Sequence, residues 1–145
     1  MMTDKGFKKE EKMKEILCID VILDQIQTVR GAAGEVTMVL FHGTFFCEAG
    51  TGKILPGGVD TQIEKKGKKS LSARYMLEGE DKNQKKFCIF VENNGECKGD
   101  GPVETHPVIY TDSEELQWME KEKLTGTVEN NGENRVRIKL YAVTA

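Results

Sequence analysis

Short runs rich in Val, Ile, Phe, Tyr and Thr divide this sequence, and clusters of Gly, Asn and Asp separate them. This pattern is typical of β-strands joined by tight turns. The last run shows it most plainly, because apolar and polar side chains alternate along it. The first set is Val136, Ile138, Leu140 and Ala142, and the second is Arg135, Arg137, Lys139 and Tyr141. A period of two buries one face of a strand and leaves the other in water.

About nine such runs follow residue 15. They are residues 16–23, 25–30, 35–48, 59–64, 71–78, 86–93, 108–111, 124–129 and 135–144. Only residues 113–123 have a helical pattern, with Asp112 or Ser113 as the cap, acids in the first turn and lysines at the end. Parallel strands need regularly alternating crossovers, which are missing, so the sheet should be antiparallel. We therefore predict an all-β fold: a closed antiparallel β-barrel of about nine strands with one short helix near the C-terminal third.

The length of 145 residues corresponds to one domain. Residues 1–14 are lysine-rich but mixed in charge and have little apolar periodicity, so we predict a flexible N-terminal arm. Residues 15–145 form the predicted barrel domain. The start lacks the apolar segment and small-residue cleavage site of a secretory signal, and the expected location is therefore cytoplasmic.

The net charge of −3 gives no field that holds a polyanion. Nucleic acid and anionic membrane surfaces are therefore not expected as partners. No apolar run approaches the roughly 20 residues of a membrane-spanning helix. A homodimer remains an alternative to a monomer, because an antiparallel barrel with aromatic outer faces is able to pair with a second copy.

The four cysteines lie far apart, and with only two histidines they lack the paired spacing of a zinc site. We expect reduced thiols, no metal and no cofactor. The segment Gly50-Thr51-Gly52-Lys53 resembles the end of a phosphate-binding loop, but Ile54 replaces the required Ser or Thr. We interpret it as a glycine-rich turn between strands.

One hexapeptide, Val-Glu-Asn-Asn-Gly-Glu, occurs at residues 91–96 and again at residues 128–133. Both copies contain Asn-Gly, a strong hairpin signal. The flanking residues of the two copies do not match, so a duplicated half-domain is not indicated. We predict two independent turns, the second of which leads into the final strand.

Several segments resemble one known family. They are His42-Gly43-Thr44-Phe45, Leu55-Pro56-Gly57-Gly58-Val59-Asp60, Ala73-Arg74-Tyr75, Phe90-Val91-Glu92-Asn93 and Trp118-Met119-Glu120. In this order they are similar to the uncharacterised family catalogued as domain of unknown function 3237. The resemblance covers most of the chain after residue 15. It implies a lipocalin-like antiparallel β-barrel and brings no assigned activity.

The lumen of a small barrel is filled by side chains or holds one small ligand, and polar groups that point inward need partners. Asp60 follows a Pro-Gly-Gly turn, so its carboxylate is expected either at the barrel mouth or as a turn cap. His42 is either a solvent-side residue or a proton shuttle. We expect Arg74 to pair with Asp60, and the alternative is an exposed ion pair between Arg74 and Glu92.

The aromatic candidates are Tyr75, Tyr110 and Trp118, each of which is either a core residue with a polar group or part of a ligand platform.

These residues favour a small-molecule-binding barrel whose ligand is a compact organic molecule. Two alternatives remain. One is a metal-independent isomerase or cyclase, in which Asp60 or His42 moves a proton while Arg74 or Tyr75 stabilises negative charge. The other is a protein interaction module that uses a sheet edge or the N-terminal arm. A lumen with buried titratable groups favours the first two functions, and a filled lumen favours the third.

Overall fold

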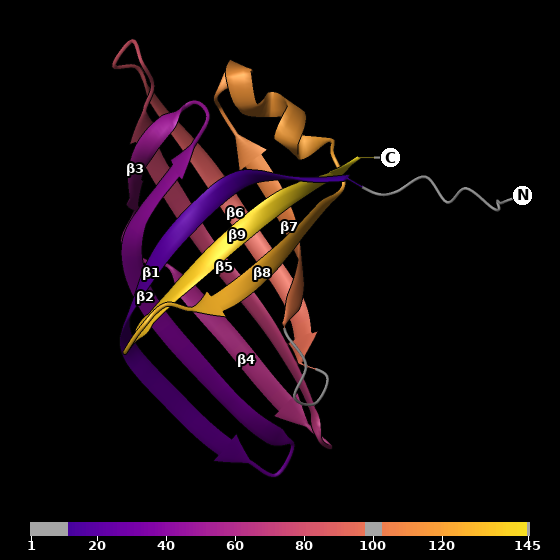
Figure 1. Cartoon of the computed structure of the whole chain (residues 1–145). Helices are drawn as coiled ribbons and strands as arrows, with labels where there is room; N and C mark the ends of the chain where they lie inside the picture. Colours follow the sequence, from indigo (N-terminus) through magenta and orange to yellow (C-terminus); the bar gives the residue numbers. More distant parts are fainter. Residues whose placement is uncertain (1–11, 98–102, 145) are drawn as a thin grey trace, which may run out of the picture.

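The computed structural model describes residues 12–97 and 103–144 (Figure 1). These residues form nine strands and one short 3₁₀ helix. The strands are β1 Lys12–Gly31, β2 Gly34–Cys47, β3 Gly50–Ile54, β4 Val59–Lys65, β5 Lys68–Glu80, β6 Lys86–Cys97, β7 Glu104–Thr111, β8 Leu124–Asn130 and β9 Arg135–Thr144. The helix, η1, is Glu114–Glu120. The prediction of an all-β chain with one short helix is confirmed for the described residues.

All nine strands belong to one antiparallel sheet whose hydrogen-bonded ladders form a ring. The ring is completed by β1, which pairs with β2 on one side and with β9 on the other. On the opposite side of the ring, the second half of β2 pairs with β3 and the first half pairs with β4. β5 in turn pairs with both β3 and β4. The ladder between β7 and β8 is the shortest, with two residue pairs.

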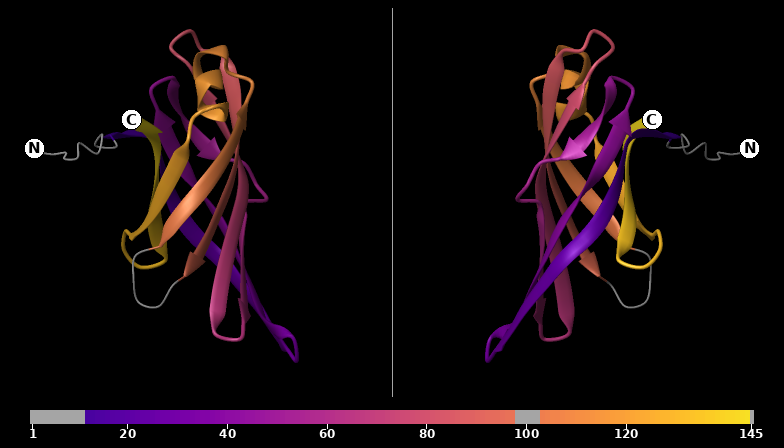
Figure 2. Two further views of the ribbon diagram at one scale, coloured as in Figure 1. Left: turned by 90° about the vertical axis from the view of Figure 1, so that its right-hand side faces the viewer. Right: turned by 90° about the vertical axis from the view of Figure 1, so that its left-hand side faces the viewer.

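The ring is deeper on one side than on the other. The β1–β9 ladder extends from Lys12 to Ile22 of β1, so the rest of β1 is paired with β2 alone among the described strands. Figures 1 and 2 show the β1–β2 and β4–β5 hairpins extending past the β8–β9 turn. We call this end of the sheet the open end, and the end beside η1 the deep end.

The deep end is filled by apolar side chains from all sides of the ring. Leu17, Ile19, Leu77, Ile89 and Leu140 are fully buried there. The buried side chains of Leu116 and Met119 on η1 join the same cluster. Burial of each such aliphatic side chain contributes about 1.5–3 kcal/mol. The deep end therefore contains much of the apolar core of the described residues.

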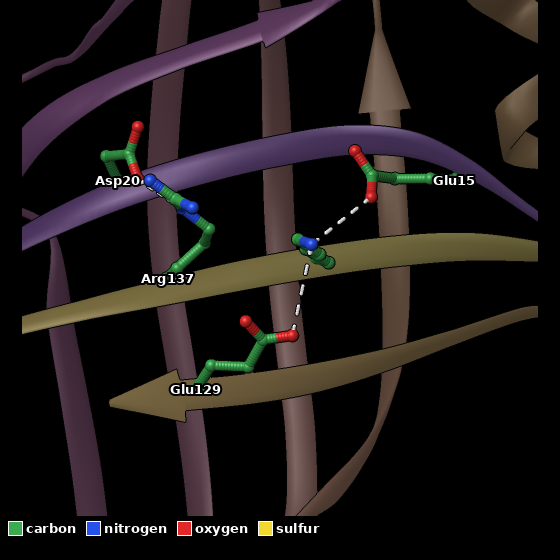
Figure 3. Close-up of polar contacts among 5 residues, drawn as sticks. Glu15, Asp20, Glu129 and Arg137 are labelled. Carbon is green, nitrogen blue, oxygen red and sulfur yellow. Dashed lines mark hydrogen bonds and ion pairs between the residues drawn. The ribbon is translucent and has the colours of Figure 1, made fainter. Parts of the chain in front are cut away.

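Ion pairs on the outer face join the strands that complete the ring (Figure 3). Arg137 Nε on β9 lies 2.8 Å from Asp20 Oδ1 on β1. Lys139 Nζ on β9 lies 3.7 Å from Glu15 Oε1 on β1 and 4.0 Å from Glu129 Oε1 on β8. Partly exposed pairs of this kind stabilise little, but opposite charges on facing strands favour this register over a shifted one.

Several boundaries differ from the sequence-based prediction. The predicted runs 16–23 and 25–30 are one strand, β1, because a bulge between Leu23 and Gln25 accommodates Asp24 without ending the ladder. β1 begins at Lys12, so residues 12–14 of the predicted arm pair with β9. Residues 1–11 lie outside the described part of the chain. The predicted helix 113–123 is a shorter 3₁₀ helix, and Ser113 makes no side-chain cap.

The interpretation of two glycine segments as turns is wrong. Residues 50–53 lie in β3, where a Cβ on Gly52 would overlap the carbonyl oxygen of Glu78 on β5. The first Asn-Gly lies inside β6, where a Cβ on Gly95 would come within 3.0 Å of the carbonyl oxygen of Glu104. Glycine permits close strand approach at both sites. The second copy does form the β8–β9 turn, in which Gly132 has φ of +118°.

Candidate functional site

The inner face of the sheet changes from apolar to polar between the deep end and the open end. Ladder register and alternation define a row of residues across neighbouring strands, which we call the inner row. It consists of Ile26, Val39, Asp60, Ala73, Asn93 and Pro107. One step deeper, the sheet presents Phe41, Tyr75, Val91 and Ile109.

One step toward the open end lies the mouth row. It consists of Thr28, Thr37, Gln62, Leu71, Gly95 and Thr105. Beyond it are charged residues, with an ion pair between Arg30 and Glu35. Ile26, the β1 member of the inner row, is 62% exposed to solvent. From the open end to the deep end, the inner face therefore changes from charged to polar to apolar.

Asp60 occupies the centre of the inner row because β4 begins at Val59, directly after the Pro-Gly-Gly turn. Gln62 Nε2 donates a hydrogen bond to Asp60 Oδ2 at 2.8 Å. Asp60 Oδ1 is buried and has no hydrogen-bond partner among the described residues. Burial raises the pKa of the Asp60 carboxyl, whereas the bond from Gln62 and the charge of Lys69 lower it. The carboxyl group is thus held at one oxygen and free at the other.

Tyr75 lies diagonally across the ladder from Asp60, two residues beyond its partner Ala73. The ring is 3% exposed and meets the ring of Phe41 edge-on, with centroids 5.4 Å apart. Its hydroxyl group has no hydrogen-bond partner in the described structure. Burial raises the pKa of this hydroxyl, and the charge of Asp60 raises it further. Tyr75 therefore keeps its proton and remains a hydrogen-bond donor.

Asn93 continues the inner row on β6, on the other side of Ala73. It is 2% exposed, and its Oδ1 has no hydrogen-bond partner among the residues described. Thr105 Oγ1, one row toward the open end, is also buried and unpaired in the described structure. A buried oxygen without a partner costs free energy, and it is commonly paired with water or a ligand. The small side chain of Ala73 leaves the space between Asp60 and Asn93 free of bulky atoms of its own.

The expected pair between Asp60 and Arg74 is wrong. Arg74 follows the inward Ala73 directly, and adjacent residues of a strand point to opposite faces. Its side chain is 66% exposed on the outer face, where Nε lies 2.9 Å from Glu92 Oε2. The alternative prediction, an exposed ion pair between Arg74 and Glu92, is confirmed. Neither residue reaches the inner row.

The other predicted site residues also lie apart from Asp60. His42 is half-exposed on the outer side, where its Nδ1 lies 2.7 Å from Asp24 Oδ1. Tyr110 is 63% exposed beside Phe90 on the outer face. Trp118 lies on η1, half-buried against the deep-end cluster. Of the seven predicted residues, the structure places only Asp60 and Tyr75 together on the inner face, and it joins Arg74 and Glu92 as an ion pair on the outer face.

Sequence analysis missed Gln62, Thr105 and the inward-facing position of Asn93. The alternation of buried and exposed residues along β6 indicated that Asn93 faces inward. Phe87, Ile89 and Val91 are all buried, and Asn93 is the next residue of the same face. The following Asn94-Gly95 suggested a turn, so the alternation was not extended as far as Asn93.

The described residues show no long apolar helix able to cross a membrane. In the same residues no three His, Cys, Asp or Glu side chains gather as a metal site would require. A separate groove of about 810 Å³ lies on the outer face of β4 to β7, where Ser72, Asn94 and His106 contribute to its lining. Its polar groups are satisfied in part by one another, since Ser72 Oγ donates to Asn94 Oδ1 at 2.6 Å. Four of the five buried side-chain oxygens without a partner in the described structure, those of Asp60, Tyr75, Asn93 and Thr105, lie on the inner wall instead. The fifth, Thr127 Oγ1, lies on the opposite face, because Thr127 pairs with the outward-facing Lys139.

Comparison with known proteins agrees with this architecture. The profile of a family described as "protein of unknown function (DUF3237)" matches residues 14–143. The chain belongs to the DUF3237 family. The family resemblance noted in the sequence is thereby confirmed. No curated protein gives a significant match to this DUF3237 chain.

Solved structures with the same fold come from several organisms. A protein of unknown function from Clostridium acetobutylicum ATCC 824 is 25% identical with a TM-score of 0.77, and the alignment covers 95% of this chain and 100% of the other. A β-barrel-like protein from Acinetobacter baumannii AYE is 17% identical with a TM-score of 0.70, covering 96% and 99%. An enzyme from Penicillium herquei is 13% identical with a TM-score of 0.69, covering 96% and 98%. At 17% and 13% identity the likeness shows the fold alone.

Proposed function

We propose that this DUF3237 chain binds a compact organic molecule on the inner wall of a barrel, with entry from the open end. The observation that carries the proposal is the set of unpaired, buried oxygens on one wall: Asp60 Oδ1, Tyr75 OH and Asn93 Oδ1. Asp60 and Asn93 belong to the inner row, and Tyr75 lies one step closer to the deep end. A protein gains nothing in stability from such groups, so their concentration at one place favours a binding role.

The chemistry of these atoms limits the ligand. A carboxylate oxygen and an amide oxygen accept hydrogen bonds, so the ligand supplies donors such as hydroxyl groups. Tyr75 OH either donates or accepts. The neighbouring Phe41, Ala73 and Val91 are apolar and suit a small carbon skeleton. The proposal keeps the cytoplasmic location expected from the sequence.

The test is extraction and mass spectrometry of small molecules that copurify with the protein from its native source. The wild type should retain one compound class in roughly stoichiometric amount. Asn93→Leu should lose it, because the variant removes an acceptor and fills the space beside Ala73. Arg74→Met, which changes only the outer face, should retain it. Equal retention by Asn93→Leu and the wild type would place the ligand elsewhere and contradict the proposal.

A further inference from the structure

The inner wall contains a base and a hydrogen-bond donor side by side, and this arrangement extends the proposed function from binding to chemistry. Asp60 Oδ1 is free while Oδ2 is fixed by Gln62. Tyr75 OH is free while its ring is fixed against Phe41. Both groups are therefore held in place before a ligand arrives, which is what a reacting site requires.

The two residues are also close enough to act on one small molecule. Asp60 pairs with Ala73, and Tyr75 is the diagonal neighbour on the same face of β5. Diagonal neighbours in an antiparallel pair have Cα atoms about 7–8 Å apart, which is within reach of an aromatic side chain such as that of Tyr75. The carboxylate also acts electrostatically on the Tyr75 hydroxyl.

We propose that Asp60 and Tyr75 catalyse proton transfer at a carbon atom next to a carbonyl group, so that the substrate class is small enolisable ketones. This inference rests on the proposed binding function. Asp60 Oδ1 would act as the base, and Tyr75 OH would donate a hydrogen bond to the carbonyl oxygen.

For a β,γ-unsaturated ketone the step is balanced without a co-reactant. Asp60 Oδ1 takes the proton from the α carbon, so the C–H bond breaks and an O–H bond forms. The C–H electron pair becomes a C=C bond, and the π pair of the carbonyl moves to oxygen, which accepts the hydrogen bond from Tyr75. The Asp60 carboxylic acid then returns the proton to the γ carbon, and the electron pairs shift back to give the conjugated ketone.

The environment of Asp60 supports this role. A partly desolvated carboxylate is a stronger base than one in water, and burial has raised the pKa of Asp60. The Tyr75 hydroxyl stays protonated for the reason given above and is able to donate to an oxyanion. The His42–Asp24 pair lacks these features, because both side chains are about half exposed and lie on the outer side.

The experiment uses the full chain and 3-cyclohexen-1-one as the probe. Binding is measured by saturation-transfer NMR, and conversion to 2-cyclohexen-1-one is followed by absorbance of the conjugated product. The wild type should bind the probe and isomerise it faster than an equal concentration of acetate. Asp60→Asn should lower the rate about 100-fold or more, and Tyr75→Phe about 10–100-fold, while both still bind the probe. The matched control Asp24→Asn, which removes a carboxylate outside the site, should keep the full rate.

Each outcome separates the two proposals. Binding without isomerisation by the wild type would overturn the proton-transfer inference and leave the proposed binding function standing. Absence of probe binding would overturn the proton-transfer inference alone, because the probe has no hydrogen-bond donors, and the extraction experiment tests the binding function separately. Isomerisation that persists in Asp60→Asn, or that is lost in Asp24→Asn, would assign the chemistry to another group and overturn the inference. Circular dichroism of each variant confirms that the fold is retained.

Discussion

Tyr75→Phe should make the protein more stable, although it alters a buried residue. The Tyr75 hydroxyl is buried without a partner in the described structure, so the variant loses no hydrogen bond. An unsatisfied buried hydroxyl costs about 1–3 kcal/mol. The ring remains, and with it the edge-on contact to Phe41. We expect the free energy of unfolding to rise by about 1 kcal/mol, the lower limit, because the new ring edge lacks an optimised contact.

In a chain of 145 residues, this gain corresponds to a rise in Tm of about 2–4 °C. Thermal and urea unfolding of the ligand-free protein measure it directly. The matched control is Tyr110→Phe. The side chain of Tyr110 is exposed, so removal of its hydroxyl should change the free energy of unfolding by less than about 0.5 kcal/mol.

A fall in Tm for Tyr75→Phe would refute the reasoning. It would mean that the Tyr75 hydroxyl already makes a hydrogen bond in the ligand-free protein, to ordered water or to a rearranged neighbour, and is not available to a ligand. A rise in Tm together with weaker ligand binding would show that this residue costs stability for the sake of the site.

Three further predictions concern the core, a close contact and pH. Leu140→Ala removes a fully buried side chain and should cost about 2–5 kcal/mol in urea unfolding; a cost below 1 kcal/mol would contradict the assigned core. Gly52→Ala should cost about 1–3 kcal/mol through overlap with β5, whereas the control Gly31→Ala, with its nearest non-neighbouring atom 3.8 Å away, should be nearly neutral in thermal unfolding. The folded pKa of Asp60 lies above its ordinary value of 3.8, so the folded state binds the proton more tightly than the unfolded state. Stability of the wild type relative to Asp60→Asn should therefore fall as pH rises from about 4 through the raised pKa, and a rise over that range of urea titrations would contradict the burial of this carboxyl.

The sequence predicted the architecture well because period-two alternation and turn residues are local signals. The last strand, the β8–β9 turn and the approximate number of strands followed directly from them. The length of β1 did not, because a bulge continues a ladder that the sequence pattern interrupts at Asp24. β3 was missed because its glycines permit close strand approach, and the sequence alone does not distinguish that role from a turn.

The site was predicted less well, although part of the missing information was in the sequence. Arg74 and Tyr75 are adjacent in a strand, so they cannot both face the lumen. A strict use of parity would have kept Tyr75 and moved Arg74 to the outer face, where it pairs with Glu92. The partnership of Asp60 with Asn93 depends on the register of three strands, β4, β5 and β6, which no local pattern determines.

The Pro-Gly-Gly turn connects the fold to the candidate chemistry. A Cβ on Gly58 would lie 3.0 Å from Cε1 of Phe41, so the absence of a side chain there makes room for the Phe41 ring. That ring in turn packs edge-on against the ring of Tyr75. Two residues later the same segment places Asp60 on the inner row. The backbone path of residues 56–60 therefore bears on both groups of the proposed site, the Asp60 carboxylate directly and the Tyr75 hydroxyl through the Phe41 ring.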